Sequence, residues 1–324
     1  MAVLLHLIVF LASLFFPTAT AIPLYAINGT NGKFISNSVY SSNLNLLFSS
    51  LSSNASAAAG FAATSTGRVP DRVYGHTLCR GDTNIATCRS CIHTAVSDIQ
   101  LLCPNFKDAI IWYDDCQLSY SSQDFLYAPN VTSDIQILMF NNQNVPADQL
   151  LRSEILTAAL LGNLSDLAVR NKSRLFATGE TVLSAGNIIY GLVQCAPDLS
   201  VGGCRTCLEG TVDATTEDPL KGKMGGRMLG IWCNMRYEFY KFYNGSSMLQ
   251  FSSDQSPSPS PSLQPLPPTP LPPIPPPSPL SPTPPTQNVT HSPVDSSNGG
   301  SNNVDIVLAI TIPIVVGLVR IAIA

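Results

Sequence analysis

The chain has 324 residues, of which only 12% are charged, and its formal net charge is −4. A nucleic-acid-binding protein needs a basic face, which this composition does not supply, so we expect no nucleic-acid partner. The length allows two domains of ordinary size together with terminal segments.

The N-terminus predicts a cleaved signal peptide over residues 1–21. An apolar run from Val3 to Phe16 is broken by Pro17, and the small residues Ala19-Thr20-Ala21 then form a site that signal peptidase accepts. An uncleaved anchor is the alternative, but about 14 apolar residues are short for a membrane span. Seven N-x-[ST] sequons agree with secretion and predict N-glycosylation. They are Asn28, Asn54, Asn130, Asn163, Asn171, Asn244 and Asn288.

The middle of the chain contains an internal repeat. Four cysteines of the first half recur 116 or 117 residues later, and a period this long indicates two complete domains rather than a solenoid. The cysteines Cys79, Cys88, Cys91 and Cys116 have the counterparts Cys195, Cys204, Cys207 and Cys233. We assign the first domain to residues 22–128 and the second to residues 129–250.

Each repeat predicts two helices and an antiparallel sheet, which places the fold in the α+β class. The first helix carries a stripe of Leu44, Leu47, Phe48 and Leu51 in repeat one, and Leu151, Ile155 and Leu156 begin the equivalent stripe in repeat two. The second helix of repeat one has its apolar face at Cys88, Cys91, Ile92, Ala95 and Ile99. Strands are expected from Ala109 to Tyr113 and from Met235 to Tyr243.

The C-terminal part changes composition twice. Residues 251–303 are rich in Pro and Ser, with 17 prolines between Pro257 and Pro293, which predicts a polyproline II stalk without a core. Residues 304–324 are apolar, and no charge occurs between Asp305 and Arg320. This segment predicts membrane attachment, either as a single span or as the signal for a GPI anchor.

The C-x2-C pairs, Cys88-Cys91 and Cys204-Cys207, are compatible with zinc ligation, a redox site or structural disulfides. A secreted chain favours disulfides, and the βαβ context of a thioredoxin-type site is missing. The residues alone leave the pairing open. They do show that repeat one, with five cysteines, has an odd one.

The pattern C-x8-C-x2-C resembles the plant cysteine-rich repeat family, whose domain is known as the ginkbilobin-homologous, or salt-stress-response/antifungal, domain. The resemblance covers about residues 22–250, and the order of two repeats, stalk and apolar segment is similar to the ectodomain of a cysteine-rich receptor-like kinase without the kinase domain. Supporting motifs are Leu78-Cys79-Arg80-Gly81-Asp82, Cys103-Pro104-Asn105, Trp112-Tyr113-Asp114, Gln194-Cys195-Ala196-Pro197-Asp198-Leu199, Gly225-Gly226-Arg227 and Arg236-Tyr237-Glu238.

The resemblance implies four disulfides: Cys79–Cys88, Cys91–Cys116, Cys195–Cys204 and Cys207–Cys233. A further family disulfide joins the first and fifth cysteines. In repeat two both of its positions, near Phe140 and Leu220, lack cysteine. In repeat one the fifth is Cys103, while the first falls at Asn28. Cys103 is therefore predicted to be unpaired, as a buried free thiol or as half of an intermolecular disulfide.

Catalytic signals are missing from the sequence. The mature chain has three histidines, His76, His93 and His291, and contains no G-x-S-x-G, H-E-x-x-H or P-loop motif. Asp114 and Asp115 could suggest a glycosidase pair, but adjacent residues on a strand end point to opposite faces. We expect no enzyme activity, no cofactor and no metal.

The antifungal member of the family holds a mannose-type sugar through an Asn, an Arg and a Glu. The resemblance places these at Asn141, Arg227 and Glu238 in repeat two, whereas repeat one has Gly29, Ile110 and Ser121. A guanidinium, a carboxylate and an amide can bind vicinal hydroxyls. The alternative is a structural ion pair, in which Glu238 is bound by Arg227 or by Arg236.

Two functions remain open. The resemblance favours a non-catalytic recognition or adaptor protein in plant stress or defence signalling, displayed at the extracellular face of the plasma membrane, with a receptor kinase or another cell-surface protein as partner. The alternative is an antifungal, mannose-binding, lectin-like protein with a carbohydrate ligand. If the repeats divide the work, repeat one is expected to contact protein and repeat two a ligand.

Overall fold

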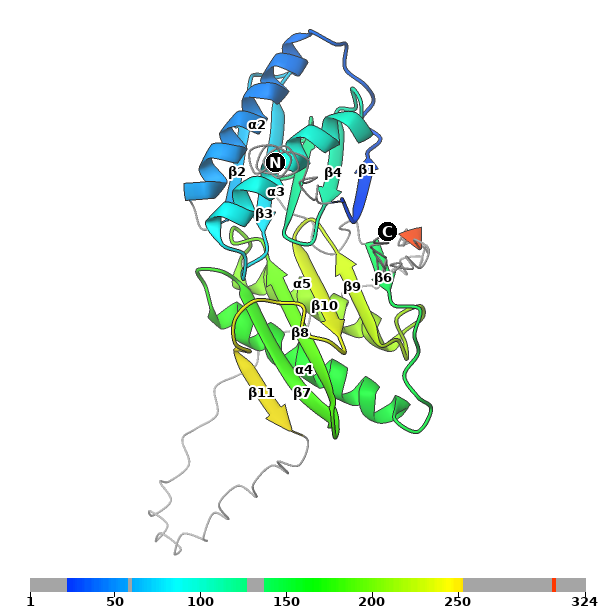
Figure 1. Cartoon of the computed structure of the whole chain (residues 1–324). Coiled ribbons are helices and arrows are strands. Elements are labelled where there is room, and N and C mark those ends of the chain that lie inside the picture. The colour runs from blue at the N-terminus through cyan, green and yellow to red at the C-terminus, as the bar shows by residue number, and fades with distance from the viewer. Residues whose placement is uncertain (1–21, 58–59, 127–136, 253–304, 307–324) are drawn as a thin grey trace, which may run out of the picture. The chain divides into compact units, whose positions relative to one another are not determined.

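The computed structural model describes residues 22–57, 60–126, 137–252 and 305–306 (Figure 1). The predicted signal peptide, the sequons Asn130 and Asn288, the stalk beyond residue 252 and almost all of the apolar C-terminal segment lie outside these residues. Among the described helices, none combines the length and the apolar character needed to cross a membrane. Of the five described sequon asparagines, Asn171 is half-buried and the other four are exposed.

The first repeat is a five-stranded antiparallel sheet with two helices on one face (Figure 1). The order of the strands across the sheet is β1-β4-β5-β3-β2. The elements are β1 (Tyr25–Asn28), α2 (Val39–Ala57), β2 (Phe61–Thr66), β3 (Val73–Cys79), α3 (Ile85–Leu102), β4 (Asp108–Trp112) and β5 (Cys116–Ser121).

The second repeat follows the same order of elements and adds a strand at each edge. Its sheet has the order β11-β7-β8-β10-β9-β6-β12, in which the two outermost strands run parallel to their neighbours and the others are antiparallel. The elements are β6 (Ile137–Phe140), α4 (Leu150–Arg170), β7 (Phe176–Ser184), β8 (Asn187–Cys195), α5 (Val201–Asp213), a 3-10 turn (Ala214–Thr216), β9 (Gly225–Leu229), β10 (Cys233–Glu238), β11 (Leu249–Ser252) and β12 (Asp305–Ile306). The α+β class predicted from the sequence is confirmed.

The helix stripes of the first repeat pack as predicted. The four residues of the α2 stripe are at most 4% exposed, and the buried residues of α3 are the five that its spacing indicates. Asn84 begins α3, because its side-chain oxygen accepts a hydrogen bond from the Thr87 amide at 2.8 Å. These two helices therefore follow directly from hydrophobic spacing and a capping residue.

Two details of the second repeat differ from the prediction. In α4 the buried stripe is Leu156, Leu160, Leu161 and Leu164, whereas Leu151 and Ile155 are 70% and 59% exposed. One position along a helix turns a side chain by about 100°, so Ile155 and its neighbour four residues earlier lie outside the stripe. The predicted strand from Met235 ends at Glu238 rather than at Tyr243. Tyr243 instead donates its hydroxyl to the Gly179 carbonyl of β7 at 3.0 Å.

Four disulfides fasten the second helix of each repeat to the sheet. In repeat one, Cys79–Cys88 joins α3 to β3 and Cys91–Cys116 joins it to β5; Cys195–Cys204 and Cys207–Cys233 do the same for α5. These are the pairs that the family resemblance implies. Each such bond contributes about 2–4 kcal/mol.

Cys103 forms no disulfide and is 3% exposed, at the C-terminal end of α3. Burial raises the pKa of its thiol, which slows reaction further. We expect a thiol reagent such as dithionitrobenzoate to label no cysteine in the folded chain and one per chain in denaturant. The variant Cys103→Ala should remove that signal. A chain without a free thiol in denaturant would instead indicate an intermolecular disulfide.

Candidate functional site

The candidate site lies on the sheet faces that the helices leave uncovered. In β9 and β10, Met228, Met235 and Tyr237 belong to the helix-facing core of the second repeat. Because side chains alternate along a strand, Arg227, Leu229, Asn234, Arg236 and Glu238 project from the opposite face. That face meets the first repeat.

An apolar cluster joins the two repeats. Ile110 and Trp112 of β4 pack with Ile137 and Leu229 of the second sheet. The Trp112 indole donates a hydrogen bond to the Gly230 carbonyl at 3.1 Å. Both repeats belong to one compact unit, and this buried junction is its physical basis.

Two buried glutamine side chains form hydrogen bonds across the junction. The Gln117 amide donates to the Ile231 carbonyl at 2.6 Å, and the Gln194 amide donates to the Cys79 carbonyl at 3.0 Å. His76, fully buried, contacts the rings of Phe61, Phe125 and Trp232. Since these bonds need the two repeats in one register, they fix the relative position of the repeats more tightly than apolar contact alone would.

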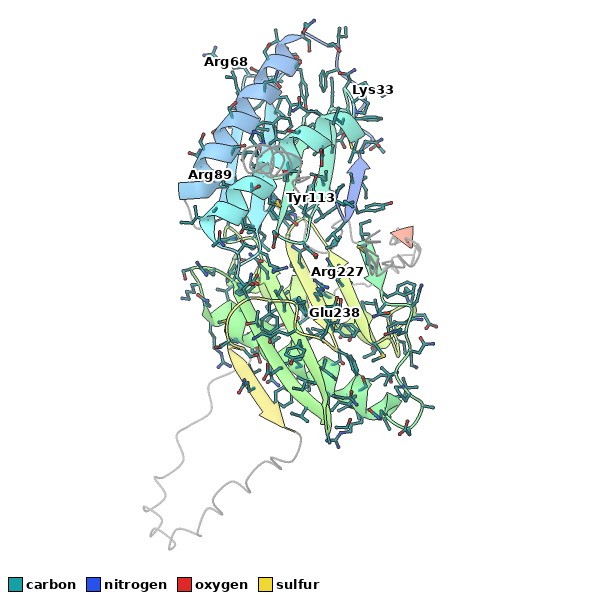
Figure 2. All side chains as sticks on the ribbon, viewed as in Figure 1. Lys33, Arg68, Arg89, Tyr113, Arg227 and Glu238 are labelled. Carbon is teal, nitrogen blue, oxygen red and sulfur yellow. A yellow bond between two sulfur atoms is a disulfide. The ribbon has the colours of Figure 1, made fainter. Side chains whose placement is uncertain are left out.

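The three residues proposed to bind sugar come together on this face. In the strand register Glu238 lies opposite Gly225. The backbone amide of Asn141 donates a hydrogen bond to the Gly225 carbonyl at 2.9 Å, so Asn141 lies next to Gly225. Arg227, two residues along β9, projects from the same face (Figure 2). A Cβ at residue 225 would collide with the Glu238 carboxylate, so this glycine allows the carboxylate to lie over β9. The side-chain oxygen of Asn141 accepts from the Gln143 amide at 2.9 Å.

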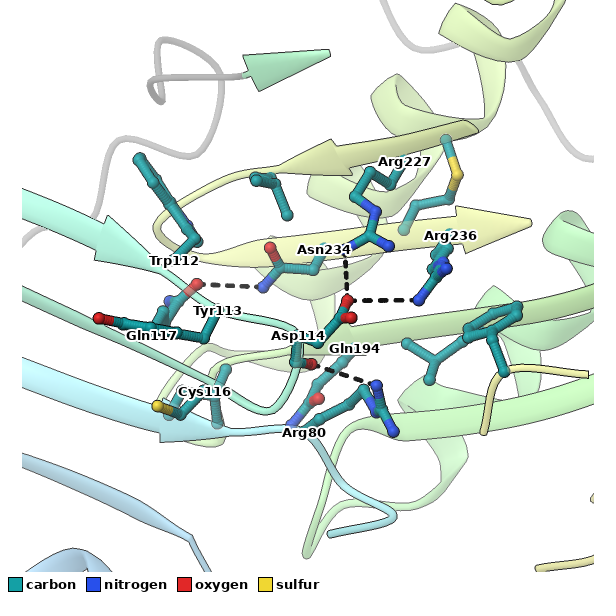
Figure 3. A pocket seen from close by; sticks show the side chains of 15 residues that line it. Arg80, Trp112, Tyr113, Asp114, Cys116, Gln117, Gln194, Arg227, Asn234 and Arg236 are labelled. Carbon is teal, nitrogen blue, oxygen red and sulfur yellow. Dashed lines mark hydrogen bonds and ion pairs between the residues drawn. The ribbon is translucent and has the colours of Figure 1, made fainter. Parts of the chain in front are cut away.

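A carboxylate of the first repeat binds the arginines of this cluster. The Asp114 carboxylate lies 2.6 Å from an Arg227 nitrogen and 3.3 Å from an Arg236 nitrogen. Dashed lines in Figure 3 mark both contacts. Arg236 also pairs with Glu238 at 3.0 Å, which is one of the ion pairs considered from the sequence. Both arginine side chains are only 12–13% exposed, so these charges depend on one another for compensation.

The pKa shifts follow from burial and from these ion pairs. Burial and the neighbouring Arg236 lower the pKa of Arg227, against the opposing effect of Asp114. Burial alone would raise the pKa of Asp114, but the arginines outweigh it and hold the pKa below its ordinary value. Burial raises the pKa of Glu238 although Arg236 opposes it. Asp114 is therefore the firmly ionised partner of the two arginines.

Little room remains beside this cluster. The cavity lined by Asp114, Arg227, Arg236, Asn234 and Phe242 measures about 60 Å³ (Figure 3). A single benzene ring occupies a cavity of about 150 Å³. The space beside Asp114 and the arginines is therefore too small to enclose a sugar ring with its hydroxyls.

The sequence did not reveal the role of Asp114. It was considered with Asp115 as a polar strand end, but both lie in the turn between β4 and β5, outside either strand. Their carboxylates have different partners, since Asp115 is 3.7 Å from Arg80. The partners of Asp114 lie 113 and 122 residues further along the chain, so no local motif could indicate the contact.

The comparisons with known proteins agree with this architecture. A family model described as salt stress response/antifungal matches residues 27–123 and 148–240. Cysteine-rich repeat secretory protein 38 of Arabidopsis thaliana is 43% identical over 212 residues, covering 65% of this chain and 81% of the relative. Cysteine-rich receptor-like protein kinase 10 of Oryza sativa subsp. japonica is 37% identical over 237 residues, which cover 72% of this chain.

The match spans only 37% of that receptor kinase, so the chain corresponds to about a third of its length. A solved structure has the same fold: the tandem DUF26 ectodomain of the Arabidopsis thaliana cysteine-rich receptor-like protein PDLP8 aligns with a TM-score of 0.56. The two are 24% identical, and the alignment covers 68% of this chain and all of the other.

Proposed function

Because the chain belongs to the salt stress response/antifungal domain family, we propose that it is a non-catalytic recognition protein outside the plant cell, binding another cell-surface protein in stress or defence signalling. The tandem would act as one binding unit at the extracellular face of the plasma membrane. Residues 304–324 would attach it there, as a single span or a GPI anchor. The names of its relatives, which are receptor kinases and a secretory protein, support this location.

The observation that carries the proposal is the ion-pair cluster of Asp114, Arg227 and Arg236. It joins the repeats and engages the guanidinium that a sugar would need. A ligand hydroxyl would have to replace the ion pair between Asp114 and Arg227 with a hydrogen bond from the guanidinium to a neutral oxygen, which is weaker. If the outer surface of the two joined repeats binds a protein partner, the ion pair between Asp114 and Arg227 stays intact and no such replacement is needed.

The alternative function, a mannose-binding antifungal lectin, is favoured by one observation. Asn141, Arg227 and Glu238 share one face of the second sheet, with Gly225 between them. If Asp114 withdraws, the Arg227 guanidinium becomes available to vicinal hydroxyls, beside a Glu238 carboxylate that still pairs with Arg236.

Titration calorimetry of the secreted chain with methyl mannoside separates the two functions. We expect no saturable binding by the wild type, because Asp114 neutralises Arg227. The variant Asp166→Ala is a matched control, since it breaks an exposed ion pair with Arg205, 2.7 Å long, away from the cluster. Saturable binding by the wild type that Arg227→Ala abolishes would establish the lectin instead.

The protein-binding proposal has its own readout. Surface plasmon resonance should detect binding of the secreted chain to at least one member of a panel of receptor-kinase ectodomains from the same domain family. Asp114→Ala is expected to weaken that binding by loosening the tandem, whereas Asp166→Ala is expected to leave it unchanged. A panel without any binder would contradict the proposal.

A further inference from the structure

A second cavity, of about 150 Å³, lies on the first sheet, on the face away from α2 and α3. Four apolar side chains line it: Ile27, Ile110, Phe125 and Ile231. Its polar side chains are Asp108, Ser119 and Ser121. The cavity is distinct from the Asp114 cluster, and only Ile231 comes from the second repeat.

Two rows of residues across the sheet form the base of this cavity. In one row Ile27 lies opposite Ile110, which lies opposite Ser119. In the next row Asp108 lies opposite Ser121, and the Gly29 amide donates to the Asp108 carbonyl at 2.9 Å. A Cβ at residue 29 would collide with the Asp108 carboxylate, so this glycine allows the carboxylate to lie over β1.

The base carries a hydroxyl without a partner. Ser119 is 2% exposed, and its Oγ has no hydrogen-bond partner among the described residues. Leaving a buried hydroxyl unpaired is costly, and such groups call for an explanation. Ser119 lies in the cavity wall on a central strand, although its Oγ itself has almost no accessible surface.

The other polar groups are arranged to accept a donor. The Asp108 carboxylate accepts hydrogen bonds from the backbone amides of Asn31, at 3.0 Å, and Thr30, and keeps further acceptor capacity. The Ser121 hydroxyl accepts from the Asn31 side chain at 3.1 Å and from the Gln123 amide at 3.0 Å. One end of the cavity is thus acidic and hydrogen-bonding, while the rest is apolar.

We propose that this cavity binds a small aromatic alcohol or amine. A cavity of about 150 Å³ accepts one benzene ring, and the isoleucines and Phe125 provide apolar walls for it. The hydroxyl or amine would donate to Asp108, and a small shift of the Ser119 side chain would bring its hydroxyl within reach. A sugar is excluded by the same walls, because they would leave most of its hydroxyls without partners. The inference is independent of the function proposed above.

Ligand-observed NMR titration of the full secreted chain tests the proposal, with benzyl alcohol, benzylamine and toluene as probes. We expect saturable binding of the alcohol and the amine, at least about tenfold tighter than toluene, as one charge-assisted hydrogen bond provides. Methyl mannoside should not compete. Failure of both polar probes to saturate, or equal affinity for toluene, would overturn the proposal.

Variants locate the site. Ser119→Val removes the unpaired hydroxyl and fills part of the cavity, and is expected to weaken benzyl alcohol binding at least about tenfold. Thr181→Val is the matched control, since Thr181 is also fully buried with an Oγ lacking a partner among the described residues, but lies in β7 of the other sheet. It should bind like the wild type. If Ser119→Val and Thr181→Val bind benzyl alcohol with equal affinity, the ligand does not bind in the cavity that Ser119 lines.

Discussion

Replacing Trp112 by alanine is expected to lower the free energy of unfolding by about 3–5 kcal/mol and to uncouple the two repeats. The side chain is 1% exposed and packs against Ile137 and Leu229 of the second sheet. Its loss leaves a cavity in the junction and removes the hydrogen bond to the Gly230 carbonyl. Denaturant unfolding followed by fluorescence and circular dichroism should change from one transition to two.

Ile111→Ala is the matched control for this prediction. Ile111 is the neighbour of Trp112 on β4, is also fully buried, and points into the core under α2 and α3. Its truncation should cost about 2–5 kcal/mol but keep a single transition, because the junction stays intact. Two transitions in both variants, or in neither, would mean that Trp112 does not couple the repeats.

Lowering the pH from 7 to 5 is expected to remove about 2 kcal/mol of stability through His76 alone. Burial lowers the pKa of His76 to about 3. The folded chain therefore keeps this imidazole neutral, while the unfolded chain binds a proton below about pH 6.5. The stability contributed by the neutral ring is fully present above that pH, and is lost as the pH falls toward 3.

Unfolding free energies of the wild type and of His76→Gln, measured at pH 7, 6 and 5, check this prediction. Subtracting the unfolding free energy of His76→Gln from that of the wild type at each pH leaves the contribution of His76. The carboxylates, several of which also have shifted pKa values, contribute equally to both proteins and cancel. His93→Gln is the control, because His93 lies exposed on α3, and this variant should keep the wild-type pH dependence. If His76→Gln loses as much stability as the wild type between pH 7 and 5, the neutral buried ring is not the cause.

His76 also connects this pH dependence to the junction. Its ring packs against those of Phe125 and Trp232, with ring centroids 5.6 and 5.2 Å away. Protonation would place an uncompensated charge among aromatic side chains from both repeats. As the pH falls, we therefore expect the contact between the repeats to weaken first. The disulfide-bonded core of each repeat is expected to weaken only at lower pH.

The sequence determined the domain class and the local framework of this protein. The repeated C-x8-C-x2-C spacing predicted the family. The count alone showed that repeat one has an odd cysteine, and the family resemblance identified it as Cys103. The α2 and α3 stripes could be predicted because helical spacing is a local property, repeated every three or four residues. The same reasoning misplaced the start of the α4 stripe, since Leu151 and Ile155 have suitable spacing but face solvent.

Only the tertiary structure decided what the candidate residues do. Asn141, Arg227 and Glu238 were named from the family pattern, yet the pairing of Arg227 with Asp114 joins positions 113 residues apart. The positions in repeat one that lack sugar-binding residues, Gly29, Ile110 and Ser121, line a cavity of different character. Long-range pairs and cavities arise from how two sheets pack, and packing leaves no periodic trace along the chain. The tandem read from the cysteines is thus one body, whose junction sets the chemistry of both candidate sites.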